Sequence, residues 1–448
     1  MTKIILVIVL FVNTAFVYAQ TNPAITSWMQ NTTIKARHYV AGNSTPINDS
    51  SPVNCQAVQY NTTDVYVTTT GLPSYVTGPF LDGNPSIATN QNAIFRIPLN
   101  PVPNTGTPVN TTGGNIGIFI NGVALFDYRD GVAWNNTTQS LCGGPGNSPC
   151  PGGMGATQNW NRDAIPAEKK GFDCSKAHPA MGNYHHHQNP SAFNLDLVVI
   201  STICNLYNAD GLYAIDSTVH SPLIGYAYDG FPIYGAYGYQ NADGSGPIVR
   251  IKSSYSLNSG NTRTLGPDVS NTYPLGYFRE DYHYNATSAG TPDYLDEHNG
   301  RFCVTPEYPS GIYCYFATVD ANWNSTYPYV VGPTFYGTRN AAKVTSVPSG
   351  TTTYSSTASN DKINLQATQV KVFPSPTNDL IIIQLIDINK ENLKVELFDM
   401  TGRLVETTSL LQGSTIAYFD AQTLYNGQYL VKISNKNSVI IQKIVVTK

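Results

Sequence analysis

Three consecutive histidines are the part of this sequence whose residue types and spacing point most directly to chemistry. Alternate side chains share a face on an extended strand, so His185 and His187 are predicted to lie together while His186 points away. Two neutral imidazoles on one face can bind a single Zn, Cu, Fe or Ni ion, and the pair alone does not choose among these metals. A metal site needs a third donor, and the nearest candidates along the chain are His178 and His220.

Two other interpretations of these histidines remain open. The chain has 30 tyrosines, which could join the histidines in a hydrogen-bonded polar core. A histidine could instead serve as a general acid or base without a metal.

The segment 229–235, with the sequence Asp-Gly-Phe-Pro-Ile-Tyr-Gly, is the second local pattern. Asp229 could orient a ligand histidine by accepting its second N–H, although we favour its interpretation as an Asx-type turn residue. Several tyrosines in and around the segment could line a shallow pocket. They are Tyr226, Tyr228, Tyr234, Tyr237 and Tyr239.

The composition of the chain predicts a mainly β protein. Charged residues make up 12% of the sequence, about half of the usual share of about 25%. The 37 Gly and 29 Pro residues favour short strands joined by turns. Strong strand patterns lie at residues 92–98 and 116–125, and a short helix is predicted within residues 163–170, after the capping residue Asp163. The expected central fold is an irregular β-rich domain with little helix.

Charge and missing motifs narrow the function classes. The net charge of −4 lacks the basic excess that nucleic-acid binding requires, so nucleic acid is not an expected partner. The sequence has no G-x-S-x-G, H-E-x-x-H, phosphate-binding or dinucleotide-binding motif. Serine hydrolases, zincin proteases, ATPases and NAD-dependent enzymes are therefore disfavoured.

Residues 1–19 have the pattern of a secretory signal peptide, with Lys3, an apolar run and Ala19 before the expected cleavage. The apolar run is shorter than the roughly 20 residues of a membrane span, and no transmembrane anchor is expected after its removal. Export places the cysteines under oxidising conditions, where disulfides persist. Local spacing suggests the pairs Cys142–Cys150, Cys303–Cys314 and Cys174–Cys204, which leaves Cys55 unpaired.

The end of the chain changes character after the predicted β-rich domain of residues 20–345. Residues 346–367 are rich in Ser and Thr and are predicted to form a flexible linker. Residues 368–448 have the strand patterns of a small immunoglobulin-like β-sandwich. The strands are expected at residues 380–385, 393–398, 403–405, 429–433 and 439–446.

The last domain resembles the C-terminal sorting domain of the type IX secretion system of Gram-negative bacteria. The matching stretches are residues 372–377, 397–403, 427–429 and 441–448, with Pro374, Pro376, Gly402 and Gly427 among them. The resemblance implies recognition by the type IX machinery, passage through the outer membrane, removal of this domain, and release or surface attachment. An ordinary adhesive β-sandwich is the alternative.

The central part resembles the YHYH protein family over about residues 80–340. The matching stretches are residues 117–123, 173–187, 220–225, 229–235, 295–301 and 304–309. Tyr184, His185 and His187 match the motif that names the family, whereas His186 stands where the family has its second tyrosine. The resemblance implies a domain boundary and does not imply a reaction.

We derive three hypotheses from these observations. The first is a secreted or cell-surface metal-binding domain that holds one Cu or Zn ion, with His185 and His187 as ligands, His220 and His178 as further ligands, and Tyr184, Asp229 and Tyr234 around them. The second is a metal-free module that binds a glycan or cell-wall polymer through a tyrosine-rich surface. The third is a metal-dependent enzyme, because a three-histidine ion with a free position can activate water.

Overall fold

The structure of the chain is a computed structural model. It describes residues 22–31, 33–43, 45–81, 87–151, 158–191, 211–355, 369–386, 392–411, 414–435 and 438–448. The predicted signal peptide, residues 1–19, lies outside these ranges. Within them, no helix combines the length and the apolar character that a bilayer crossing requires.

An eight-stranded mixed sheet forms the centre of the molecule and carries the histidine motif. Its strands, in spatial order, are β12 (Ala177–Ala180), β13 (Asn183–His186), β8 (Ala124–Phe126), β7 (Asn115–Phe119), β14 (Leu223–Ala227), β15 (Pro232–Tyr234), β21 (Ile312–Phe316) and β20 (Gly300–Cys303). Every residue of β14 and β15 is buried, so the middle of the sheet is covered on both faces. Its strands contribute several of the largest fully buried side chains, namely Phe119, Tyr226, Tyr234, Tyr315 and Phe316.

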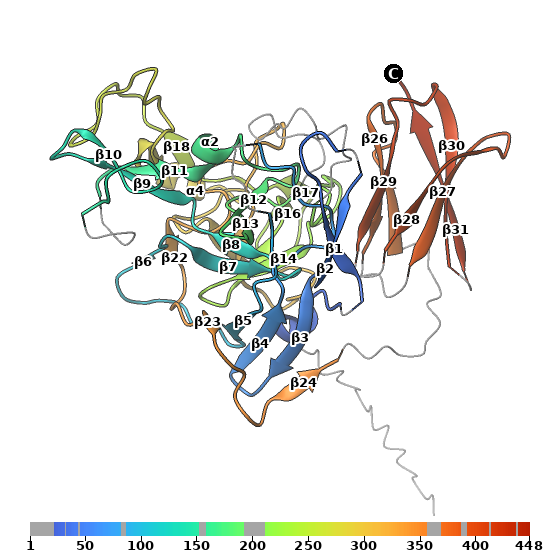
Figure 1. Cartoon of the computed structure of the whole chain (residues 1–448), viewed down its shortest axis with the longest axis horizontal. Coiled ribbons are helices and arrows are strands. Elements are labelled where there is room, and N and C mark those ends of the chain that lie inside the picture. The colour runs from blue at the N-terminus through green and yellow to red at the C-terminus, as the bar shows by residue number, and fades with distance from the viewer. Residues whose placement is uncertain are drawn as a thin grey trace, which may run out of the picture.

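A five-stranded antiparallel sheet closes one end of the central part (Figure 1). Its strands, in spatial order, are β23 (Ala342–Val344), β5 (Ala93–Pro98), β4 (Asp64–Thr69), β3 (Cys55–Tyr60) and β24 (Thr352–Tyr354). The last of these strands falls inside residues 346–367, which the sequence predicts to be linker. Thr352–Tyr354 pairs with Val58–Tyr60 at the edge of the sheet.

Small sheets and short helices complete the central part. The small sheets contain β1 (Lys35–His38) with β2 (Ile47–Pro52), β6 (Val109–Asn110) with β22 (Thr334–Phe335), β16 (Tyr237–Tyr239) with β17 (Ile248–Arg250), β18 (Tyr255–Leu257) with β19 (Tyr282–Tyr284), and β9 (Arg129–Asn135) between β10 (Ser140–Cys142) and β11 (Asn161–Asp163). The helical segments are α1 (Pro23–Thr26), α2 (Ala164–Glu168), the 3-10 turn η2 (Arg279–Asp281) and α4 (Ala286–Ala289). The mainly β prediction is confirmed, as is the short helix after Asp163, whose carboxylate accepts from the N–H of Ile165.

The strand predicted at residues 116–125 is two strands, because the chain reverses between β7 and β8. The N–H of Gly122 donates to the carbonyl of Phe119 at 2.8 Å and closes the turn. Gly122 has a φ of +79°, and a Cβ at this position would lie 2.0 Å from Oγ1 of Thr69. Only glycine fits this backbone conformation and this close approach.

The C-terminal strands form a separate sandwich with its own core, drawn in orange and red in Figure 1. One sheet has the order β25 (Val370–Phe373), β26 (Leu380–Leu385), β29 (Ile416–Asp420), and the other has the order β28 (Leu404–Leu410), β27 (Leu393–Asp399), β30 (Gly427–Ser434), β31 (Val439–Val446). The expected strands are all present. Pro374 and Pro376 follow cis peptide bonds, Gly402 has a φ of +83° in the turn before β28, and Gly427 begins β30.

The cysteines differ in part from the expected pairing. Cys142 and Cys150 form the predicted disulfide. Cys174 is also disulfide-bonded, and its predicted partner, residue 204, lies outside the described residues. Cys303 and Cys314 are free, buried thiols, so the pairing predicted for them is wrong. Cys55 is free and buried, as predicted.

Candidate metal centre

A tight hairpin brings His178 and His185 together. Strands β12 and β13 are joined by Met181 and Gly182, whose φ values of +49° and +82° are those of a two-residue turn with two left-handed residues. This turn fixes the antiparallel register in which His178 lies directly opposite His185. Residues directly opposite in such a pair have Cβ atoms about 4.5–5.5 Å apart, so their side chains meet on one face.

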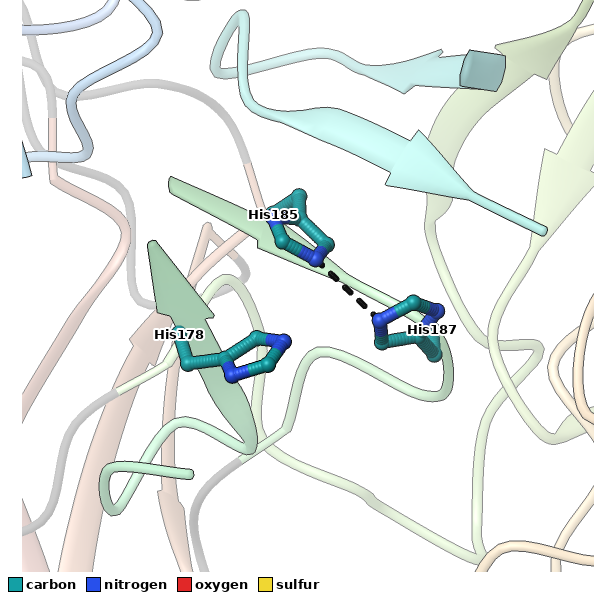
Figure 2. Close-up of side chains that lie close together, drawn as sticks. All are labelled: His178, His185 and His187. Carbon is teal, nitrogen blue, oxygen red and sulfur yellow. Dashed lines mark hydrogen bonds between the residues drawn. The ribbon is translucent and has the colours of Figure 1, made fainter. Parts of the chain in front are cut away.

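His187 joins the same face because it follows His185 by two residues. Nε2 of His185 and Nε2 of His187 are 3.1 Å apart, and Figure 2 shows the rings of His178, His185 and His187 turned toward one another. The donor atoms of these three histidines all lie within 4.8 Å of one another. The cluster therefore combines an alternate pair on one strand with a cross-strand partner.

Backbone carbonyls determine which ring nitrogens face the centre of the cluster. Nδ1 of His185 lies 2.9 Å from the carbonyl oxygen of Asn183, and Nδ1 of His187 lies 2.7 Å from that of Asp127. A carbonyl oxygen only accepts, so each Nδ1 must carry the proton and donate it. In the neutral rings both Nε2 atoms then present lone pairs toward each other, and such an arrangement needs a cation, either a proton or a metal ion, close to both.

The spacing of the nitrogens suits a metal ion. Ligands at about 2.0–2.1 Å from one ion are about 2.9 Å apart at a right angle and about 3.4 Å apart at a tetrahedral angle. The separation of 3.1 Å between His185 and His187 falls in this range. Burial, together with the neighbouring His187 and His178, holds the pKa of His185 well below its usual value. The ring is therefore neutral at physiological pH, which is the form that binds metals.

Glu168 adds a carboxylate to the histidine cluster. Its Oε2 is 3.1 Å from Nε2 of His178 and 3.2 Å from Nε2 of His187. Glu168 is the last residue of α2, which the capping carboxylate of Asp163 anchors beside β9. Burial alone would raise the pKa of Glu168, but the neighbouring His178 and His187 outweigh burial and hold the pKa well below its usual value. The site thus offers three imidazoles and one carboxylate anion.

Two phenylalanines surround the cluster with apolar surface. The ring of Phe126, at the end of β8, stacks on His185 with centroids 3.9 Å apart. Phe172 meets His178 edge to face at 4.9 Å. All three histidines are less than 10% exposed. An apolar wall of this kind weakens the screening of charges, so an ion held here would interact strongly with its ligands.

The opposite face of β13 carries a tyrosine and histidine network. Nε2 of His186 lies 2.9 Å from the hydroxyl of Tyr75, and the hydroxyl of Tyr184 donates to the carboxylate of Asp173 at 2.8 Å. The same carboxylate accepts from the N–H of Ser175 just before β12. The polar core that we considered as an alternative is therefore present beside the metal-ligand geometry, on the other side of the strand.

His220 lies apart from the cluster. Its ring packs against those of Tyr234 and Tyr239, and its Nδ1 donates to the carbonyl of Ser221 at 2.7 Å. It lines a cleft of about 790 Å³ that also includes Glu307 of the central part and Lys371 of the C-terminal domain. Of the four histidines predicted as ligands, the structure thus brings together His178, His185 and His187.

Asp229 and three of the tyrosines near it, Tyr226, Tyr228 and Tyr234, lie in the packed core. The carboxylate of Asp229 accepts from the N–H of Phe231 in an Asx turn at 3.2 Å, and from the hydroxyl of Tyr315 at 2.6 Å. Tyr226, Tyr228 and Tyr234 are buried. They therefore do not form the exposed tyrosine surface that a stacking interaction with a glycan would require.

The burial of His220 makes a testable prediction about acid stability. Burial lowers the pKa of His220 to about 4 from its usual value of 6.5, so between these pH values the unfolded chain binds a proton that the folded chain does not. Stability present above pH 6.5 is then lost as the pH falls toward 4, by roughly 3 kcal/mol at 1.36 kcal/mol per pKa unit. Urea denaturation at several pH values will measure the slope of the unfolding free energy against pH. The slope is expected to be smaller in His220→Gln and unchanged in His283→Gln, whose side chain is exposed; equal slopes in all three proteins would contradict the prediction.

Comparison with known families identifies two parts of the chain. The family described as "YHYH protein" matches residues 94–328, and the family described as "Secretion system C-terminal sorting domain" matches residues 371–447. The first match contains every residue of the cluster, Glu168 included. A search of curated proteins gives no match.

Two solved structures show limited similarity to this chain. A DUF3244-family protein with an immunoglobulin-like β-sandwich fold from Bacteroides vulgatus has 14% identity and a TM-score of 0.15, over 17% of this chain and 83% of that one. A β-glucuronidase from Parabacteroides merdae has 12% identity and a TM-score of 0.12, over 17% of this chain and 12% of that one. Similarity this low carries no argument about function.

Proposed function

This chain belongs to the YHYH protein family, and we propose that its family domain is an exported metal-binding domain with one transition-metal ion per chain. The C-terminal sorting domain directs the protein to secretion or to the outer cell surface. The ligands in this proposal are Nε2 of His178, His185 and His187, with the carboxylate of Glu168 as the fourth.

The observation that carries the proposal is the direction of the ring nitrogens. Nδ1 of His185 and His187 donate to backbone carbonyls, so two acceptor nitrogens face each other at 3.1 Å beside a carboxylate. A divalent ion satisfies all of these groups at once. Imidazole suits both Zn and Cu, so we propose either of these ions.

Metal analysis of the purified full chain tests this proposal directly. We expect about one Zn or Cu per chain after equilibration and removal of loosely bound ions, and a loss of affinity of tenfold or more when one ligand is removed. The variants are His178→Ala, His185→Ala and His187→Ala.

Two histidines outside the cluster provide matched controls for this experiment. His283 is exposed and His220 lies in the separate cleft, so His283→Ala and His220→Ala are expected to retain the full metal content. If the three cluster variants bind as much metal as the wild type, a proton shared by the histidines and Glu168 accounts for the geometry, and the proposal is rejected.

A further inference from the structure

Glu168 differs from the three histidines in its exposure to solvent. The side chain of Glu168 is 25% exposed, against 9% for His178 and 4% for His187. His185 is covered by Phe126, and the Nδ1 atoms of His185 and His187 are held by backbone carbonyls. The Glu168 oxygen that faces the histidines is itself buried, so an external molecule would reach the centre of the cluster once this side chain moves away.

The contacts of Glu168 also leave it easier to displace than the histidines. It sits at the end of the five-residue helix α2, and the residues that follow, 169–171, form a turn. The histidines come from a hairpin that is paired into the eight-stranded sheet. Displacement of Glu168 would therefore need movement of the end of a short helix, whereas displacement of a histidine would disturb the paired hairpin.

We propose that Glu168 is an exchangeable ligand, and that a small carboxylate anion of the formate or acetate class binds the metal in its place. The inference rests on the proposed metal site. The class of anion follows from Glu168 itself. A coordination position on the metal that accepts the carboxylate of Glu168 also accepts a carboxylate from solution. One metal–oxygen bond breaks and one forms, the oxidation state of the ion is constant, and both carboxylates remain anions.

Cobalt substitution provides the test, because the visible spectrum of Co²⁺ reports its ligands. The full chain loaded with Co²⁺ is titrated with formate, and the absorption is expected to change and to saturate. In Glu168→Ala no internal carboxylate competes, so half-saturation is expected at a formate concentration lower by about tenfold or more, since competition reduces the fraction of sites that can bind. Glu406→Ala, which removes an exposed glutamate from the C-terminal domain, is expected to behave as the wild type.

The outcomes separate this inference from the proposed function. If Co²⁺ does not bind the wild-type chain, the metal site itself is rejected. If Co²⁺ binds and formate leaves the spectra of the wild type and Glu168→Gln unchanged, Glu168 does not exchange and the inference is overturned. Equal formate affinities in the wild type and Glu168→Ala would also overturn it. The wild type and Glu168→Gln decide the question if Glu168→Ala does not fold.

Discussion

Chelation of the proposed metal ion is expected to lower the melting temperature of the full chain by several degrees. The proposed ligands come from α2 and from the β12–β13 hairpin, so the ion would link a short helix to the edge of the eight-stranded sheet. A ligand that binds only the folded state stabilises it by about 4 kcal/mol when its free concentration is 1,000 times its Kd. Calorimetry of the metal-loaded chain with and without a strong chelator measures this difference.

The histidine variants show whether this stabilisation comes from the cluster. In His185→Ala the melting temperature is expected to be the same with and without chelator, because the site has lost a central ligand. His220→Ala is expected to keep the full difference. An unchanged melting temperature of the wild type after chelation would contradict this prediction. If chelation lowers the melting temperature of His185→Ala as much as that of the wild type, the metal binds elsewhere.

Replacing Gly122 by alanine is expected to destabilise the central part by about 2–4 kcal/mol. The added Cβ would lie 2.0 Å from Oγ1 and 2.7 Å from Cβ of Thr69, and such overpacking costs about 1–3 kcal/mol. The left-handed backbone at this position adds about 1 kcal/mol for a residue with a side chain. Because the turn leads into β8, which pairs with β13 beside the histidines, we also expect weaker metal binding.

Gly114 provides the matched control for this substitution. It has a φ of +88°, close to that of Gly122, but a Cβ there would meet no atom within 4 Å. Gly114→Ala is therefore expected to show only the backbone cost of about 1 kcal/mol. Urea denaturation of both variants measures the two losses, and equal losses would show that contact with Thr69 does not matter.

Much of the fold could be predicted from the sequence where patterns are local. The strands at residues 380–385 and 439–446 match β26 and β31 at both ends, because each is a short apolar or alternating run bounded by turn residues. The run at residues 116–125 was harder to interpret, since its apolar character continues through the turn at Gly122. The close approach of Thr69, which requires glycine there, is a tertiary contact and leaves no local signal.

The candidate site could be predicted in part for the same reason. His185 and His187 could be predicted to lie together because their positions depend only on the alternation of side chains along one strand. The opposition of His178 and His185 follows from the two-residue turn at Met181 and Gly182, and recognition of this turn in the sequence would have favoured His178 over His220. Glu168 was missed because its position depends on how α2 packs near the sheet, and no spacing along the chain encodes that contact.

The pairing of β24 with β3 has a practical consequence for the design of shortened proteins. We propose the boundary of the central domain after Tyr354, because Thr352–Tyr354 forms the outer strand of the five-stranded sheet. A truncation at residue 345 would remove that strand and expose the unpaired backbone N–H and C=O groups of β3. Exposed edges of this kind promote pairing between chains and aggregation. A stop codon a few residues after Tyr354 would instead yield a central domain whose five-stranded sheet keeps β24 as its edge strand.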